Sequence, residues 1–325
     1  AQGAWQTRPP MRRHLSRLHP SLVRRSLVCV SLVCLSPVVT AGCTRSGETA
    51  APQVRVDPGE HAFFDAAGAP AEFAALVAGV ADVEFVAFGE MHFHAVGGRY
   101  ELALLEGMAA QPRPVALALE FFEADHQPAL DAYLAGEIDE ATFRQRTGRD
   151  AKYDDSHRPL VEFCKQRKIP VIAANAPRRL VTAYRKSGLE YSAYLRGLSD
   201  ADRGLLPRAS VPPDDAFKAR FIAFMGPKRG PAFYPAMALW NDAMAESAAD
   251  FRAAHPEHRV LLVVGAFHVA GRLGAITQYL ARRPDDRAQV LVMQATEGPM
   301  VATAEDRDEG DLVLKVRVVE AAGAR

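Results

Sequence analysis

Cysteine is scarce in this chain, with four residues among 325. Three of them, Cys29, Cys34 and Cys43, fall within the first 43 residues, and only Cys164 belongs to the remainder. A single thiol cannot support a framework of internal disulfide bonds, so the fold must depend on a packed apolar core. Hydrophobic residues make up 49% of the chain, which is enough for such a core.

Acidic residues are absent from the first 43 positions, which carry six arginines. The whole chain has 39 basic and 39 acidic residues, so the part after this segment keeps 33 basic residues against all 39 acidic ones. A protein that binds nucleic acid through its phosphates needs an excess of positive charge. The sequence therefore predicts no nucleic-acid partner.

Long apolar runs are also lacking. The run from Ser26 to Val39 follows two arginines and is shorter than the roughly 20 residues that a membrane-spanning helix needs, which is typical of a targeting segment. The sequence Thr-Ala-Gly before Cys43 resembles a bacterial lipobox, in which Cys43 is lipidated; the alternative is an ordinary secretory signal cleaved nearby. We expect a lipoprotein signal segment at 1–43, a flexible tether at 44–60 and one domain at 61–325.

What the sequence does contain is a series of short apolar runs separated by helical patterns. Continuous apolar strands that alternate with helices are typical of a parallel sheet covered on both faces. Residues 189–254 contain no predicted strand and indicate a helical insertion before the last core strands. The fold class is therefore α/β, with a mostly parallel sheet flanked by helices. Buried strands are predicted at 83–88, 115–119, 170–174, 259–264 and 289–294, and edge strands at 61–65 and 312–318.

Polar residues follow four of these strands at the point where each one ends. Gly-x-x-His occurs twice, at 89–92 and 265–268, while Glu120 and Asn175 follow the second and third strands. Ligands of open α/β sheets bind outside the carboxyl ends of the strands. The repeated motif therefore predicts a site at one edge of the sheet.

Two carboxylates and two imidazoles at this edge could hold a divalent metal: Glu90, Glu120, His92 and His268. Such a metal could lower the pKa of bound water, with Glu90 or Glu120 acting as the catalytic general base. Each residue also has an ordinary interpretation. The two histidines could be turn residues, and Glu120 could cap a helix or form a salt bridge.

Three further residues could line the site. His94 follows the first motif closely, but its neighbour Phe93 suggests that it alternates away. Asn175 could equally be a turn or cap residue. Arg178 stands at a predicted helix start, where it could bind an anionic group or simply face solvent.

Five segments together resemble the ChaN family of haem-binding lipoproteins. They are Gly89-Glu90-Met91-His92, the Ala-Leu-Glu-Phe strand end at 118–121, Gln127 to Leu134, Ala173 to Arg178, and Gly265 to Val269. That family belongs with the erythromycin esterases and the TraB and Tiki proteins in a wider group marked by two Gly-x-x-His motifs. The resemblance extends from about Phe63 to Gln294.

The resemblance implies haem binding and a role in haem and iron uptake at the bacterial cell envelope, on the periplasmic face or at the outer membrane. It also implies the lipid anchor at Cys43 and an outer-membrane haem or iron receptor as partner. Haem ligation in the family is by tyrosine, with haems held between two protomers, so a homodimer is expected. No motif fixes this tyrosine, and the candidates are Tyr191, Tyr194 and Tyr234 in the helical insertion.

The chain departs from the family at Phe93, where the first motif commonly continues with aspartate. If that aspartate helps to hold a metal, His94 has to replace it. Tiki proteins in the wider group are metal-dependent proteases. The alternative function is therefore a metal-dependent hydrolase of the peptidase or esterase type, with His92 and His268 at the metal and Glu90 or Glu120 as the base.

Overall fold

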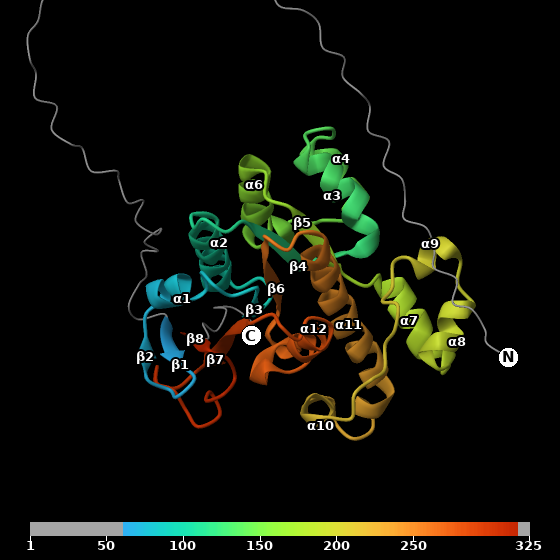
Figure 1. The fold of residues 1–325 in the computed structure, drawn as a ribbon. Helices are drawn as coiled ribbons and strands as arrows, with labels where there is room; N and C mark the ends of the chain where they lie inside the picture. The colour runs from blue at the N-terminus through green and yellow to red at the C-terminus, as the bar shows by residue number, and fades with distance from the viewer. Residues whose placement is uncertain (1–60, 318–325) are drawn as a thin grey trace, which may run out of the picture. The chain divides into compact units, whose positions relative to one another are not determined.

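The computed structural model describes residues 61–317 (Figure 1). The predicted signal segment and tether, together with Cys43, lie outside the described residues. Within 61–317 no helix has both the length and the apolar character needed to cross a membrane.

The core is one sheet of eight strands. Its order is β2-β1-β8-β7-β3-β6-β4-β5, and the pairs from β8 through β5 are parallel. The strands are β1 His61–Asp65, β2 Pro70–Ala71, β3 Phe85–Glu90, β4 Val115–Glu123, β5 Val171–Asn175, β6 Arg259–Gly265, β7 Ala288–Thr296 and β8 Leu312–Arg317.

Two predicted edge strands lie inside the sheet. β1 pairs antiparallel with both β2 and β8, and β8 also pairs with β7. The prediction that 61–65 and 312–318 are edge strands was therefore wrong, because the two-residue strand β2 covers one side of β1 and β8 lies between β1 and β7. The α/β class and the mostly parallel sheet are confirmed.

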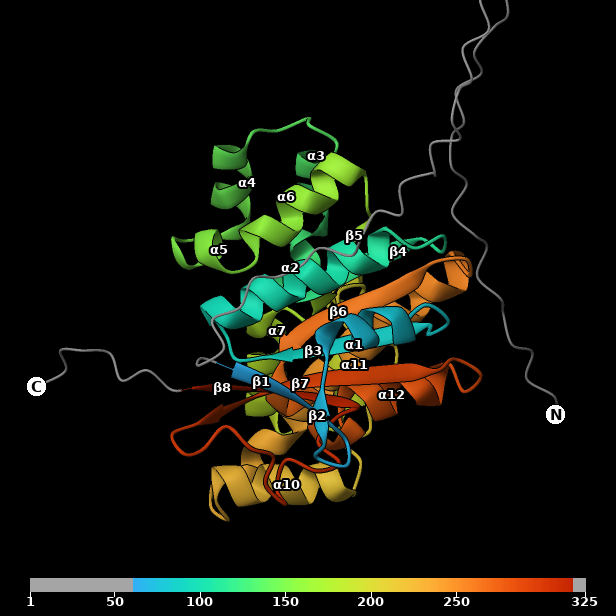
Figure 2. The same ribbon diagram turned by 90° about the vertical axis from the view of Figure 1, so that its left-hand side faces the viewer.

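Helices cover both faces of the sheet. They are α1 Phe73–Gly79, α2 Ala95–Ala109, α3 Gln127–Leu134, α4 Glu140–Thr147, α5 Lys152–Asp155, α6 Arg158–Arg167, α7 Arg178–Ser187, α8 Tyr191–Arg196, α9 Asp200–Arg203, α10 Ala216–Met225, α11 Gly230–Ala254 and α12 Ala275–Arg282. Figure 2 shows α2 and α12 on opposite sides of the strands.

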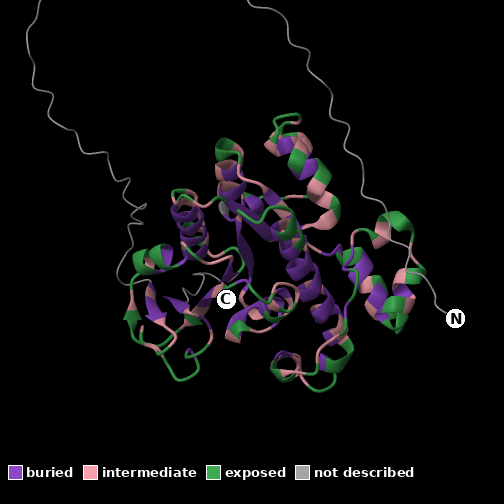
Figure 3. Cartoon of the chain, in the orientation of Figure 1, coloured by how far each residue is buried: buried purple, intermediate pink, exposed green. Residues whose placement is uncertain are grey.

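Alternation along each central strand divides the core in two. Val86 and Phe88 of β3 pack in one apolar cluster with residues of α1, α2 and α6, whereas Phe85 and Ala87 pack in another with residues of α11 and α12. Figure 3 shows the central strands as largely buried, and β3 and β6 are buried at every position. Fully buried parallel strands of this kind are what their continuous apolar runs indicate.

The helical insertion is confirmed, but its last helix, α11, packs directly on the sheet. α11 packs on β5 and β6, and its Met244, Ala245 and Ala248 join the core on that face. The other helices of the insertion, α8, α9 and α10, lie to either side of the amino-terminal half of α11 (Figure 1). Because α11 runs across the sheet, it can present polar residues to the strand ends.

Candidate functional site

The two Gly-x-x-His segments lie side by side at the carboxyl edge of the sheet. In the parallel pairing of β3 with β6, Glu90 stands opposite Gly265. β4 is the next strand beyond β6, and β5 follows it. The four strand ends that carry polar residues are therefore neighbours, and the segment after β3 meets the segment after β6.

Glu90 is a buried carboxylate with two imidazole partners. It is 5% exposed, and its Oε1 accepts hydrogen bonds from Nδ1 of His92 at 2.7 Å and from Nε2 of His157 at 3.2 Å. Burial by itself would raise the pKa of Glu90, but the hydrogen bonds from His157 and His92 outweigh it and hold the pKa well below its usual range. Glu90 therefore fixes a negative charge at the end of β3.

His92 is the open histidine of the site. Its side chain is 53% exposed. The hydrogen bond to Glu90 raises the pKa of His92, against the opposing effect of partial burial, and the charge of Glu120 adds to the increase. The protonated form of His92 is therefore stabilised where it can still meet a ligand from solvent.

Glu120 reaches the same edge through an irregularity in β4. This strand runs on to Glu123 and does not end at Glu120 as predicted, and its pairing with β5 shifts in register between Leu119 and Glu123. Such bulges re-aim side chains near functional sites. Oε2 of Glu120 accepts the backbone N–H of Gly265 at 2.6 Å, and Oε1 lies 3.6 Å from Nε2 of His268. Glu120 thus connects β4 to the second motif.

His268 is the enclosed histidine of the site. Its Nδ1 donates to Oδ1 of Asn241 on α11 at 2.6 Å, and both residues are buried. Burial lowers the pKa of His268, which favours the neutral ring. With its proton on Nδ1, the lone pair of Nε2 faces Glu120.

Three residues of this region escaped the sequence prediction. Glu101 on α2 and His157 before α6 are each 1% exposed and lie beside Glu90, while Asn241 holds His268. Burial, together with the neighbouring charge of Glu90, raises the pKa of Glu101 well above its usual value. The burial of Glu101 could have been predicted from the sequence, because it stands on the same helix face as Leu104, Leu105 and Met108. The sequence held no such signal for His157, in the turn before α6, or for Asn241 on α11.

The three residues predicted to line the site stand on three different elements. His94 is the N-cap residue of α2, two residues beyond His92. Asn175 stands on β5 opposite Glu123, and Arg178 is exposed on the first turn of α7. Among the described residues, no hydrogen bond or ion pair joins Asn175 or Arg178 to Glu90, Glu120 or the two motif histidines.

The three candidate tyrosines have buried hydroxyl groups that are already used. Tyr191, Tyr194 and Tyr234 are at most 7% exposed, and their hydroxyls donate to the backbone carbonyls of Pro207, Leu180 and Pro213. Burial raises the pKa of each phenol, which disfavours the phenolate. The other five tyrosines of the chain are buried as well. Tyrosine ligation of haem stays a prediction that this arrangement does not support.

Phe93 is an exposed aromatic residue beside the open histidine. Its side chain is held outward by a left-handed backbone with φ of 63°, and 47% of its surface is exposed. A large residue in this conformation is under backbone strain. Nζ of Lys152 lies 5.2 Å from the centre of the Phe93 ring, and Phe121 packs edge-on against it. An apolar ring face, an imidazole and a cation therefore lie together at this edge.

The four predicted metal ligands do not form a single group in which all ligand atoms lie within 4.8 Å of one another. Within residues 61–317, three groups of side chains bring their ligand atoms close enough for a shared metal, and none of them contains His92, Glu120 or His268. Glu90 instead groups with Glu101 and His157. Glu120 accepts the backbone N–H of Gly265, and His268 donates to Asn241.

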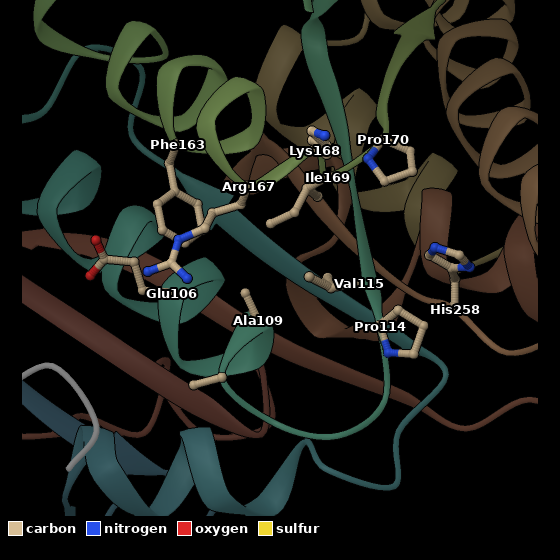
Figure 4. Close-up of a pocket in the computed structure, with 11 residues that line it drawn as sticks. Glu106, Ala109, Pro114, Val115, Phe163, Arg167, Lys168, Ile169, Pro170 and His258 are labelled. Carbon is tan, nitrogen blue, oxygen red and sulfur yellow. The ribbon is translucent and has the colours of Figure 1, made fainter. Parts of the chain in front are cut away.

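A separate cavity opens at the opposite edge of the sheet. It has a volume of about 480 Å³ and lies where β4, β5 and β6 begin, between the ends of α2 and α6 (Figure 4). Phe163, Ile169 and Pro170 form its apolar wall, and Arg167 and Glu106 flank it. It is distinct from the edge that carries the Gly-x-x-His motifs.

Comparison with known families identifies the chain. The sequence model of the family described as haem-binding uptake, Tiki superfamily, ChaN matches residues 76–279, which is more than half of the chain. The chain belongs to this family. The match spans β3 to α12 and therefore includes both Gly-x-x-His motifs. No curated protein sequence matches the chain.

A solved structure of a ChaN protein shares the fold, and two further structures match less well. A structure described as cofacial heme binding to ChaN of Campylobacter jejuni matches with a TM-score of 0.56 and 14% identity, over 79% of this chain and 97% of that one. The type III effector HopBA1 matches with a TM-score of 0.44 and 14% identity, over 83% and 99% of the two chains. A mutant of the erythromycin esterase EreC in its open conformation matches with a TM-score of 0.43 and 13% identity, over 69% and 72%.

The open side of the edge has the chemical groups that a haem requires. Haem is a flat apolar ring with an iron that takes an axial ligand and two propionates that carry negative charge. Phe93 offers an exposed ring face, His92 an exposed imidazole and Lys152 a positive charge. The residues present at this edge therefore fit the ligand of the ChaN family.

Proposed function

We propose that this chain carries haem at the cell envelope and binds it on the side of the site formed by His92, Phe93 and Lys152. The observation that carries the proposal is the exposure of Phe93, a large apolar residue held outward on a strained backbone directly after the first motif. An unneeded strain of this kind costs about 1–3 kcal/mol and persists mainly at functional positions.

We propose His92 as the axial ligand of the haem iron. The reason is accessibility, because the imidazole of His92 is exposed whereas all eight tyrosines of the chain are buried. The Glu90 carboxylate accepts the proton of His92 Nδ1, which orients the ring and makes the other nitrogen a better donor to iron. Lys152 supplies a charge that can pair with a propionate.

Hemin titration of the chain from residue 44 to residue 325 tests haem binding. We expect a shifted Soret band at micromolar hemin, and a weaker shift for Phe93→Ala, which loses the ring face without touching the sheet. Arg178→Ala on α7 is the matched control, because it removes an exposed side chain from another element. Absence of any spectral change in the wild-type chain would sink the proposal.

The proposal extends to an anchor, a partner and an assembly. Lipid at Cys43 would hold the protein to the bacterial membrane, the haem would pass to or from an outer-membrane haem or iron receptor, and the haem-loaded form would be a homodimer. Support comes from the lipobox-like sequence and from the family. Cys43→Ser should release the protein from the membrane fraction, and unchanged fractionation would refute the anchor. Gel filtration with and without hemin tests the dimer.

The metal-dependent hydrolase is less well supported. It needs Glu90, His92, Glu120 and His268 around one metal, whereas the described structure groups Glu90 with Glu101 and His157. Metal analysis of protein purified without chelator, repeated on His92→Ala and His268→Ala, separates the two functions. A stoichiometric metal that is lost in both variants would favour the hydrolase.

A further inference from the structure

We propose that Glu90, Glu101 and His157 form a buried site for a divalent first-row transition metal. The site lies behind His92, inside the domain, and differs from the metal set that the two Gly-x-x-His motifs suggest. It joins the end of β3, the second turn of α2 and the residue before α6. Metal binding at this site does not require haem.

Geometry is the first support. One ligand atom of each residue lies within 4.8 Å of the ligand atoms of the other two, so a single ion could contact all three after small side-chain movements. Glu90 is 5% exposed, and Glu101 and His157 are each 1% exposed. Charged groups this deeply buried are normally paired or coordinate a metal.

Glu101 gives the second, independent support. Its Oε2 is buried and has no hydrogen-bond partner among residues 61–317. A buried polar atom without a partner costs about 1–3 kcal/mol. Coordination of a cation through both oxygens of the Glu101 carboxylate would satisfy this one.

The orientation of His157 is the third support. The hydroxyl of Ser156 donates to the carbonyl of Lys152 at 2.7 Å, so the Ser156 oxygen is left to accept the proton on Nδ1 of His157 at 3.0 Å. Nε2 of the same ring points at Oε1 of Glu90, 3.2 Å away, and a bound metal would replace the proton between these two atoms. A hydrogen-bond partner on the remote ring nitrogen is typical of a metal-binding histidine.

The ligand chemistry indicates the class of metal. Two carboxylates and one imidazole suit Zn²⁺, Mn²⁺ or Fe²⁺, and the two negative charges balance a divalent ion. His92 would not bind this metal itself. Its hydrogen bond to Oε1 would orient the Glu90 carboxylate, which does. The metal would brace α2 and α6 against the sheet beneath Phe93.

Metal analysis of the haem-free full chain, purified without chelators, tests the site. We expect about one divalent metal per chain. After the metal is stripped, addition of Zn²⁺ or Mn²⁺ at a hundredfold excess over Kd should raise the melting temperature by roughly 5 °C. Co²⁺ should give visible absorption bands in the wild-type chain, which requires no variant. Substoichiometric metal together with no thermal shift and no Co²⁺ bands would overturn the proposal.

Glu101→Gln is the decisive variant. The amide has the shape of the carboxylic acid, so it should fold, but it should lose the metal and the thermal shift. The double variant His255→Gln, His258→Gln is the matched control, because it removes an exposed cluster that could bind metal adventitiously. Metal retained by Glu101→Gln, or lost in the control, would also overturn the site. Hemin binding can fail without changing any of these outcomes.

Discussion

The two histidines of the repeated motif differ in almost every physical respect, although they lie at adjoining strand ends. His92 is half exposed, has a raised pKa and donates to a buried carboxylate, whereas His268 is enclosed, has a lowered pKa and donates to a neutral amide. The same four-residue pattern therefore builds one imidazole for contact with a ligand and one for internal support.

The two glycines that open the motifs differ in the same way. A Cβ atom on Gly89 would lie 2.9 Å from Cγ2 of Val269 and 3.0 Å from the backbone of Ala266. A Cβ atom on Gly265 would instead lie 2.9 Å from Nε2 of His92, which is part of a movable side chain. One glycine allows the two segments to pack, and the other leaves room for the open histidine.

The largest effect is expected from alanine at the first of these glycines. Gly89→Ala would push the backbone of Ala266 away from β3 and should lower the free energy of unfolding by about 1–3 kcal/mol. Gly265→Ala should cost less, because the His92 ring can turn, but it should weaken hemin binding. Urea unfolding and hemin titration of both variants check this. A larger loss of stability in Gly265→Ala than in Gly89→Ala would contradict these different roles of the two glycines.

Two asparagines provide the next test. Asn241→Leu removes the acceptor of His268 Nδ1 and should cost about 1–3 kcal/mol, because a buried donor is left without a partner. Asn175→Leu is the matched control. Its Oδ1 is buried without a hydrogen-bond partner among the described residues, so its removal should be neutral or slightly stabilising. Equal losses in the two variants would show that Asn241 does not hold His268.

The pH dependence of the two histidines should have opposite signs. His92 has a raised pKa in the folded state, so its contribution to stability is present below the unfolded value near 6.5 and is lost as the pH rises through the folded pKa. His268 has a lowered pKa, so stability is lost as the pH falls from about 6.5 through the folded pKa. NMR titration of the ring protons, assigned with His92→Ala, should place His92 above 6.5 and His268 below it. The reverse order would contradict the structure.

The smallest effect on stability is expected at Phe93. Asparagine tolerates a left-handed backbone, so Phe93→Asn should leave the free energy of unfolding unchanged or raise it by up to about 1 kcal/mol. The same variant should bind hemin less tightly, since the ring face is lost. Unfolding and hemin titration of one preparation give both numbers. Lower stability with unchanged hemin affinity would mean that Phe93 serves the fold and not the ligand.

Short continuous apolar runs alternating with helical patterns predicted the sheet, because parallel strands covered on both faces are apolar at successive positions. The neighbouring positions of residues 90 and 265 followed from parallel pairing. The order of the outer strands did not, because the path of β8 back between β1 and β7 depends on contacts far apart in the sequence. The bulge that aims Glu120 and the burial of Glu101 and His157 also depend on packing that no local pattern encodes.

Hemin titration of His92→Ala beside the triple variant Tyr191→Phe, Tyr194→Phe, Tyr234→Phe tests the proposed function most directly. If His92 is the ligand on the open side of the site, His92→Ala should lose the Soret shift of the wild-type chain. The triple variant should keep the shift, because its three hydroxyls are buried and bound to backbone carbonyls. A shift that survives in His92→Ala and disappears in the triple variant would contradict the assignment of the open histidine.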